Sequence, residues 1–263
     1  MSTYVLDNAS EQAARRFASL EACYDPVTIR QLGQVGVSPG WSCLEVGGGG
    51  GSIARWLAER VGPSGRVVVT DIDARWLDFK HPNIELREHN IATDELEWGA
   101  FDLVHERLVL IHLPERERAL RRMIDALSPG GWILIEDFDC SWTALEPAGE
   151  PNDAALFVKV LGAFLEVLDQ AGVDLAYGRH FHSLLHRQGL VDVHVEAHID
   201  ISSGGSPGFA LFRANIEQLR DRLVDLGLVT NREIDRVYEL FEDPEFSCNH
   251  QPLVSGRARR PLR

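Results

Sequence analysis

A run of five glycines between two apolar segments constrains the fold of this 263-residue chain more than any other feature. The apolar segment Leu44–Val46 leads into Gly47–Gly51, and a helical pattern follows; the next apolar segment, Val67–Thr70, ends at Asp71. Strand, glycine turn, helix, strand and acid form the βαβ unit that binds adenosine-containing ligands. Glycines let the backbone approach a ligand closely, and the Asp71 carboxylate can accept hydrogen bonds from ribose hydroxyls.

The spacing of the glycines distinguishes two classes of ligand. A dinucleotide loop needs Gly-x-Gly-x-x-Gly, but its last position falls on Ser52 or Ile53 here. The observed pattern is an acid followed by alternate glycines, namely Glu45, Gly47, Gly49 and Gly51. This spacing disfavours a nucleotide-dependent oxidoreductase, which we keep as an alternative.

From residue 41 to residue 138, short apolar segments alternate with helical patterns. Strands are expected at 41–46, 66–71, 84–88, 102–105 and 132–137, and helices at 52–61, 74–79 and 115–127. Consecutive βα units predict a mostly parallel sheet with helices on both faces. Two later strands, near 190–201 and 248–257, lack a crossover between them and predict an antiparallel pair. The expected fold class is α/β, with a seven-stranded Rossmann-like sheet.

The remaining segments are predicted to be helical. Residues 1–40 form a lead-in or lid, with one helix over 11–20 and a second that begins at Pro26. Residues 41–263 form the main domain, which carries cap insertions at about 140–178 and 204–246. The lead-in could exchange between subunits, so a homodimer is an open alternative.

Composition excludes several classes of partner. The net charge of −14 argues against a nucleic-acid surface, which needs clustered Lys and Arg. No apolar run approaches the roughly 20 residues of a membrane helix, and the polar N-terminus does not resemble a signal peptide. The 4 cysteines are scattered without a CxxC pair, which suits a reducing cytoplasm.

Two further segments, together with the acid-glycine motif, carry a family resemblance. Phe101–Pro114 and Leu127–Trp132 match the fourth-strand pattern and the turn before the fifth strand of class I S-adenosylmethionine-dependent methyltransferases. The chain resembles their small-molecule type, similar to the ubiquinone and menaquinone methyltransferases and to natural-product tailoring enzymes of secondary metabolism. The resemblance implies S-adenosyl-L-methionine as cofactor and methyl transfer as activity.

The resemblance also implies a set of cofactor-binding residues. Glu45 and the alternate glycines form the loop under the methionine part, Asp71 holds the ribose, and Ile72 packs on the adenine. The further implied contacts are Asn90 and Ile91 at the adenine, Glu106 and Arg107 near the methionine end, and Tyr4 as a lid residue. The family often has an acid where this chain has Asn90, and its glycine motif often includes a bulkier residue.

Methyl transfer needs a base only if the acceptor atom carries a proton that must leave. Candidates are His112, Asp137, His180 and His182. His112 is equally explained by packing at the start of the next helix. His180 and His182 form a His-x-His pattern, and His182 and His186 form an i, i+4 pair. Either pair could supply two ligands of a metal site. No third anchored ligand is evident, so no metal is expected.

Aromatic residues concentrate in the lead-in and the two insertions and predict a large apolar acceptor cavity. We therefore expect a small hydrophobic or aromatic metabolite as acceptor, with oxygen favoured over carbon or nitrogen. A remaining alternative is a methyltransferase-like fold that acts without methyl transfer, as a cyclase or a binding protein.

Overall fold

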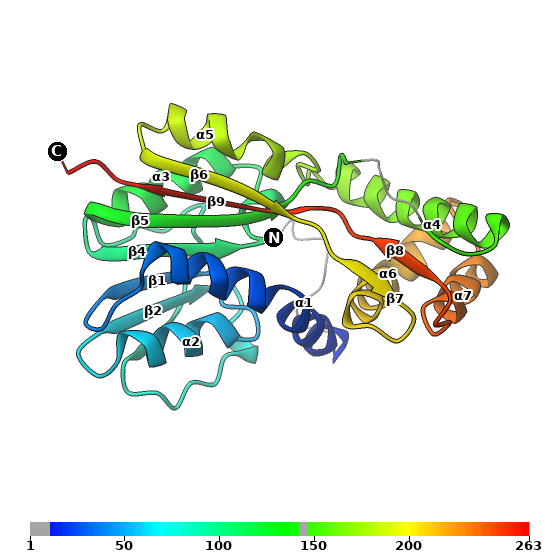
Figure 1. Ribbon diagram of the computed structural model, residues 1–263, viewed down its shortest axis with the longest axis horizontal. Helices are drawn as coiled ribbons and strands as arrows, with labels where there is room; N and C mark the ends of the chain where they lie inside the picture. The colour runs from blue at the N-terminus through cyan, green and yellow to red at the C-terminus, as the bar shows by residue number, and fades with distance from the viewer. Residues whose placement is uncertain (1–10, 143–146, 263) are drawn as a thin grey trace. The chain divides into compact units, whose positions relative to one another are not determined.

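The computed structural model describes residues 11–142 and 147–262 (Figure 1), so Tyr4 lies outside the described residues. The chain divides into two compact units, each built from three segments. We call Tyr24–Asp139, Ala176–His198 and Leu253–Arg263 the sheet unit. We call Met1–Cys23, Cys140–Leu175 and Ile199–Pro252 the helical unit.

The sheet unit contains a seven-stranded sheet in the order β3-β2-β1-β4-β5-β9-β6. Its strands are β1 (Ser42–Val46), β2 (Arg66–Asp71), β3 (Ile84–Glu88), β4 (Phe101–Arg107), β5 (Leu127–Phe138), β6 (Val191–His198) and β9 (Leu253–Arg259). The first five strands along the chain pair in parallel, whereas β9 is antiparallel to both β5 and β6. The expected fold class is confirmed, including the antiparallel pair.

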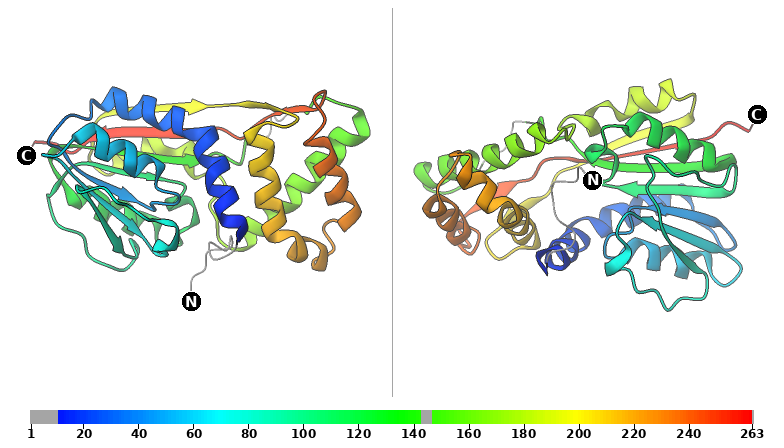
Figure 2. Two further views of the ribbon diagram at one scale, coloured as in Figure 1. Left: turned by 90° about the horizontal axis from the view of Figure 1, so that it is seen from below. Right: turned by 180° about the vertical axis from the view of Figure 1, so that it is seen from behind.

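Helices cover both faces of this sheet (Figures 1 and 2). Leu32 and Val35 of α1 (Glu11–Val35) share one core with Leu57 of α2 (Ser52–Val61) and with the inward side chains of the strands. On the opposite face lie α3 (Arg116–Ala126) and α5 (Phe181–Arg187), the latter packed on Gly256 of β9. Short 3₁₀ turns η1 (Ala74–Trp76), η2 (Leu110–His112) and η3 (Tyr177–His180) complete the unit.

Two local predictions were wrong. The lead-in has one helix, α1, rather than a second helix that begins at Pro26. Pro26 lies inside α1, where it removes one backbone donor, and the Asp25 side chain bonds Arg107 instead of capping a new helix. The helix expected at 74–79 is reduced to η1, where the Asp73 side chain accepts a hydrogen bond from the Arg75 backbone N–H.

The helical unit is held together by an aromatic cluster. It contains α4 (Pro151–Gln170), α6 (Pro207–Asp225), α7 (Asn231–Leu240) and the part of α1 up to Cys23. The buried Phe157 ring of α4 makes edge contacts with rings of α6 and of the segment after α7, namely Phe209, Phe212, Phe241 and Phe246. Strands β7 (Ile201–Ser203) and β8 (Ser247–Asn249) form a second, two-stranded sheet that was not expected. No helix in the described part of the chain is long and apolar enough to cross a membrane.

Candidate functional site

The glycine loop follows β1 and is held by the neighbouring strand β2. The backbone N–H groups of Gly47 and Gly48 donate to the Thr70 carbonyl, with N···O distances of 2.7 and 3.2 Å. Gly47, Gly49 and Gly51 all have positive φ angles, of 75°, 55° and 85°. Only glycine adopts this left-handed region without steric penalty, so the alternate glycines are explained by the backbone conformation.

Neighbouring side chains add a second reason for glycine at these positions. A Cβ at Gly47 would collide with Val109, which follows β4. A Cβ at Gly51 would lie 2.7 Å from the Phe79 ring. The loop backbone is therefore packed tightly from two sides, and its amides keep a fixed direction at the carboxyl end of β1.

Asp71 ends β2 and Ile72 follows it, beside this loop. The Asp71 Oδ2 accepts a hydrogen bond from the Gly49 N–H at 3.1 Å, and its Oδ1 accepts one from the Asp73 N–H at 3.0 Å. Burial raises the pKa of Asp71, and these two backbone donors partly offset the effect. The next side chain, Ile72, is 51% exposed. An acceptor carboxylate thus lies next to an uncovered apolar side chain.

Asn90 and Ile91 lie beyond the end of β3. The Asn90 Oδ1 accepts a hydrogen bond from the Ala92 N–H at 2.9 Å, so the amide oxygen stabilises its own turn. The Asn90 backbone N–H donates to Asp94 at 2.9 Å, and Ile91 is buried. This turn therefore has a fixed conformation.

Glu106 of β4 and Asp137 of β5 are both fully buried. Glu106 accepts backbone hydrogen bonds from Val109 at 3.0 Å and from Glu136 at 3.2 Å. Burial outweighs these donors and raises the pKa of Glu106 to about 7. Neither Asp137 oxygen has a hydrogen bond of normal geometry to a described residue. Burial, reinforced by the Glu106 carboxylate, raises the pKa of Asp137 well above its ordinary value.

Sequence reasoning missed His105, a fully buried histidine on β4. Its Nδ1 lies 2.6 Å from Glu45 Oε2, and its Nε2 lies 3.3 Å from Glu136 Oε2. Burial alone would lower the pKa of His105, but the two carboxylates raise it from 6.5 to about 10. The sequence did contain a signal for this cluster, because Glu45, His105 and Glu136 are ionisable residues within otherwise apolar strands. Buried charges require partners of opposite sign, so these residues could be expected to pair.

Arg107 points toward α1. Its two Nη atoms donate to Thr28 Oγ1 and to Asp25 Oδ1, each at 2.9 Å. Arg107 thus fixes α1 on the sheet, and its proposed place near the methionine end stays a prediction.

The histidine candidates differ in their surroundings. His112 ends η2, directly after β4, and is half-buried. His180 ends η3 and His182 is the second residue of α5, and both side chains are exposed. The His182 ring packs against His186, with 4.7 Å between the centroids. Within the described residues, no group of three or more His, Cys, Asp or Glu side chains could hold a metal ion.

The loop, the carboxylate and the apolar side chain together fit an adenosine-containing cofactor. Gly47–Gly51 leave no Cβ between the backbone and a ligand. Asp71 supplies the acceptor that a ribose diol needs, and Ile72 supplies a partly exposed apolar surface for a base. All of these groups follow carboxyl ends of parallel strands, where ligands bind in such sheets.

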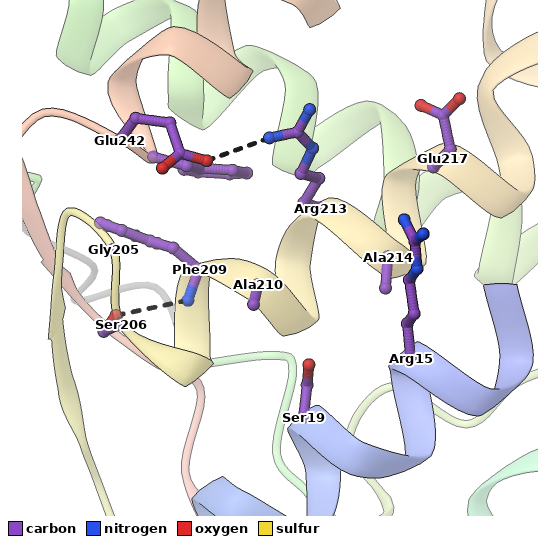
Figure 3. Close-up of a pocket in the computed structure, with 11 residues that line it drawn as sticks. Arg15, Ser19, Gly205, Ser206, Phe209, Ala210, Arg213, Ala214, Glu217 and Glu242 are labelled. Atoms are coloured by element: carbon purple, nitrogen blue, oxygen red, sulfur yellow. Dashed lines mark hydrogen bonds and ion pairs between the residues drawn. The ribbon is translucent and has the colours of Figure 1, made fainter.

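A cavity of about 470 Å³ lies within the helical unit (Figure 3). Its apolar lining comes from Phe209, Ala210 and Ala214 of α6 and from Phe241. Arg213 pairs with Glu242 at 3.0 Å across the cavity margin. The remaining lining residues are Arg15, Ser19, Gly205, Ser206 and Glu217. The volume and the mixed lining are in the range of small-molecule sites.

This sheet order, with a glycine loop after β1 and an acid at the end of β2, defines a Rossmann-like domain that binds an adenosine-containing cofactor. The model of a family described as "Methyltransferase domain" matches residues 10–195. The chain therefore belongs to the methyltransferase domain family, whose cofactor is S-adenosylmethionine. The resemblance found in the sequence is confirmed.

Individual relatives agree with this family. The chain is 35% identical over 155 residues to Methyltransferase str2 of Strobilurus tenacellus. The aligned region covers 58% of this chain and 54% of that protein. It is 34% identical over 124 residues to the ubiquinone/menaquinone biosynthesis C-methyltransferase UbiE of Laribacter hongkongensis, covering 44% and 50%. The chain thus spans about half the length of these relatives.

Among solved structures, a Haemonchus contortus phosphoethanolamine N-methyltransferase 2 has a similar fold. That structure holds phosphomonomethylethanolamine and S-adenosylhomocysteine. The TM-score is 0.60 at 18% identity, with 99% of this chain and 60% of that chain covered. At this identity the likeness concerns the fold alone.

Proposed function

We propose that the protein transfers a methyl group from S-adenosylmethionine to a small hydrophobic or aromatic metabolite, with oxygen as the favoured acceptor atom. The observation that carries the proposal is the Asp71 carboxylate bonded to the Gly49 N–H, beside the exposed Ile72. When bound, S-adenosylmethionine supplies an activated methyl group on a sulfonium, so the chain's residues need mainly to bind and orient.

The sheet unit supplies the residues for the cofactor. Asp71 accepts from the ribose, and its second contact, to the Asp73 N–H, holds the carboxylate in place. The Gly47–Gly51 backbone is fixed by internal hydrogen bonds, and its lack of Cβ atoms lets the cofactor approach it closely. Asn90 and Ile91 border the base, and Glu106 fixes the segment after β4 through the Val109 N–H.

The cavity of the helical unit supports an acceptor with an apolar body. Phe209 and Phe241 offer aromatic surface, while Ser19 and Ser206 offer hydroxyl groups. Such a mixture suits a ring or chain that carries one or two polar atoms. One of the relatives is named a C-methyltransferase, which keeps carbon as the second candidate acceptor atom.

A base would accept the proton of a hydroxyl acceptor. Asp137 lies near the carboxyl end of β5, His112 follows β4, and His180 and His182 belong to the η3–α5 segment. Burial raises the pKa of Glu106 to about 7 and also raises the pKa of the neighbouring Asp137, and a general base works best with a pKa near the operating pH. The candidates are distinguished by four single variants, H112Q, D137N, H180Q and H182Q. Only the variant that removes the base should change the acid limb of the pH profile of kcat/KM.

Calorimetry with S-adenosylhomocysteine tests the cofactor, and mass spectrometry after incubation with S-adenosylmethionine and a panel of hydroxyaromatic compounds tests transfer. Binding together with a product 14 mass units heavier supports the proposal, since a methyl group replaces one hydrogen. Absence of S-adenosylhomocysteine binding would contradict the proposed function. Binding without transfer to any member of the panel favours the alternative of a fold used without methyl transfer.

An Ala210→Phe variant tests the cavity. Ala210 is exposed and lines the cavity, so a larger side chain there fills the space without disturbing the core. We expect the KM for the acceptor to rise about 10-fold or more while the Kd of S-adenosylhomocysteine stays unchanged. Ala155→Phe, at an exposed position of α4 outside the cavity, is the matched control. Equal effects of both variants would exclude the cavity as the acceptor site.

A further inference from the structure

A chain of hydrogen bonds leads from α1 across the sheet unit to the glycine loop. It begins at Thr28, whose Oγ1 donates to Glu136 Oε2 at 2.5 Å. Ser255 of β9 donates to the other Glu136 oxygen at 2.5 Å. Arg107 donates to Thr28 from the other side at 2.9 Å. The carboxylate of Glu136 is therefore fixed by α1 and by β9 at once.

His105 is the centre of this chain. Its two ring nitrogens lie 2.6 Å from Glu45 Oε2 and 3.3 Å from Glu136 Oε2. An imidazole donates from both nitrogens only in its charged form. A charged ring also balances the site, since Glu45 and Glu136 face it from β1 and β5 and the Arg107–Asp25 pair lies beyond Thr28.

Glu45 connects His105 to the loop. Only one residue, Val46, separates Glu45 from the first left-handed glycine, Gly47. The Glu45 carbonyl accepts a hydrogen bond from Thr70 Oγ1 at 3.2 Å, and the Thr70 carbonyl accepts from the Gly47 N–H at 2.7 Å. A shift of the Glu45 side chain would therefore move the backbone that presents the loop amides.

We propose that His105 is a positioning residue for the cofactor, which couples the packing of α1 to the conformation of the glycine loop. This inference rests on the proposed function, because the loop is the cofactor site. His105 itself touches no reacting atom and acts through Glu45. Coupling is reciprocal, so cofactor binding also stabilises the packing of residues 24–35 of α1 on the sheet.

The principal test compares wild type with His105→Gln and with the double variant H105Q/E45Q. Calorimetry gives the Kd of S-adenosylhomocysteine, and hydrogen exchange follows the amides of 47–52 and 24–35. We expect H105Q to weaken binding about 10-fold or more, since it leaves two buried carboxylates without a cation. The double variant removes one of these charges and keeps a polar pair, so it recovers binding to within about 3-fold of wild type.

Val104→Ala is the matched control. Val104 precedes His105 on β4, is also fully buried, and points to the other face of the sheet. It lowers stability by removing apolar packing but leaves the hydrogen-bond chain intact. We expect its Kd to stay within about 2-fold of wild type. A loss of affinity in V104A equal to that in H105Q, at a matched loss of stability, would overturn the inference.

Thr28→Val provides a second test if H105Q does not fold. It removes one hydroxyl at the α1 end and keeps the Glu45–His105–Glu136 charges. We expect faster exchange at 47–52 and loss of the protection that S-adenosylhomocysteine gives to residues 24–35 in wild type. Unchanged exchange in both segments contradicts the coupling. If wild type does not bind S-adenosylhomocysteine, the proposed function itself is contradicted. Failure of the coupling and failure of the proposed function are therefore distinguishable.

Discussion

Asp71 accepts a hydrogen bond from the backbone N–H of Gly49, with 3.1 Å between its Oδ2 and that nitrogen. The last residue of β2 thus sets the position of the loop after β1. A single carboxylate shapes the glycine loop and, in the proposed function, also accepts hydrogen bonds from the ribose.

Replacement of Asp71 by Ala should weaken S-adenosylhomocysteine binding. The loss of a hydrogen bond to a charged group is worth about 1.5–3 kcal/mol, or roughly 10- to 100-fold in Kd. Calorimetry measures the change. Asp73→Ala is the control, because that partly exposed carboxylate accepts hydrogen bonds from the Arg75 backbone N–H and side chain and, within the described residues, none from the glycine loop. An equal loss in D73A would show that the turn, rather than the Asp71 carboxylate, determines affinity.

Gly47→Ala should destabilise the protein through two separable effects. The left-handed φ of 75° costs a non-glycine residue about 1–2 kcal/mol, and the new Cβ collides with Val109. Gly189→Ala isolates the first effect, since Gly189 follows the end of α5 with a left-handed φ of 78° and has no atom within 4 Å of an added Cβ. Urea unfolding should show a larger loss for G47A than for G189A. Val109→Ala in the G47A background should restore part of the difference.

Stability should fall as pH rises from about 6.5 to about 10, in part because of His105. The pKa of His105 is raised in the folded state, so its stabilising contribution is complete below 6.5 and is lost through about 10. Its share of the slope is at most about 1.4 kcal/mol per pH unit. Urea unfolding between pH 7 and 9.5 measures the free energy of unfolding. In H105Q this share should be absent, and an unchanged slope would show that His105 is not charged in the folded protein.

Asp137→Asn should stabilise the protein at alkaline pH. The pKa of Asp137 is raised on folding, so its ionisation opposes folding as pH rises above the ordinary value of 3.8. An amide of the same shape lacks this charge, and we expect a gain of about 1–2 kcal/mol at pH 8 that shrinks toward pH 5. Thermal unfolding at the two pH values measures the effect. A gain that does not depend on pH would point to packing as its cause.

The parts of the site that depend on local sequence could be predicted. The alternate glycines, Asp71 and Ile72 occupy turns whose backbone is set by adjacent residues, and strands such as Ile84–Glu88 have the expected bounds. The His105 cluster could not be predicted in this way, since its members meet only when β1, β4 and β5 align in register. Strands β7 and β8 have three residues each, too short for an alternating pattern to appear.

The position of β9 has a consequence for the order in which the protein can fold during synthesis. β9 is the last strand along the chain, yet it lies between β5 and β6 in the sheet. Until Leu253–Arg259 leaves the ribosome, β6 has no partner and both β5 and β6 expose an unpaired edge. The parallel part from β3 to β5 can form earlier. Completion of the sheet therefore follows translation of the helical unit, and a nascent chain stalled before residue 253 exposes an edge that invites aggregation.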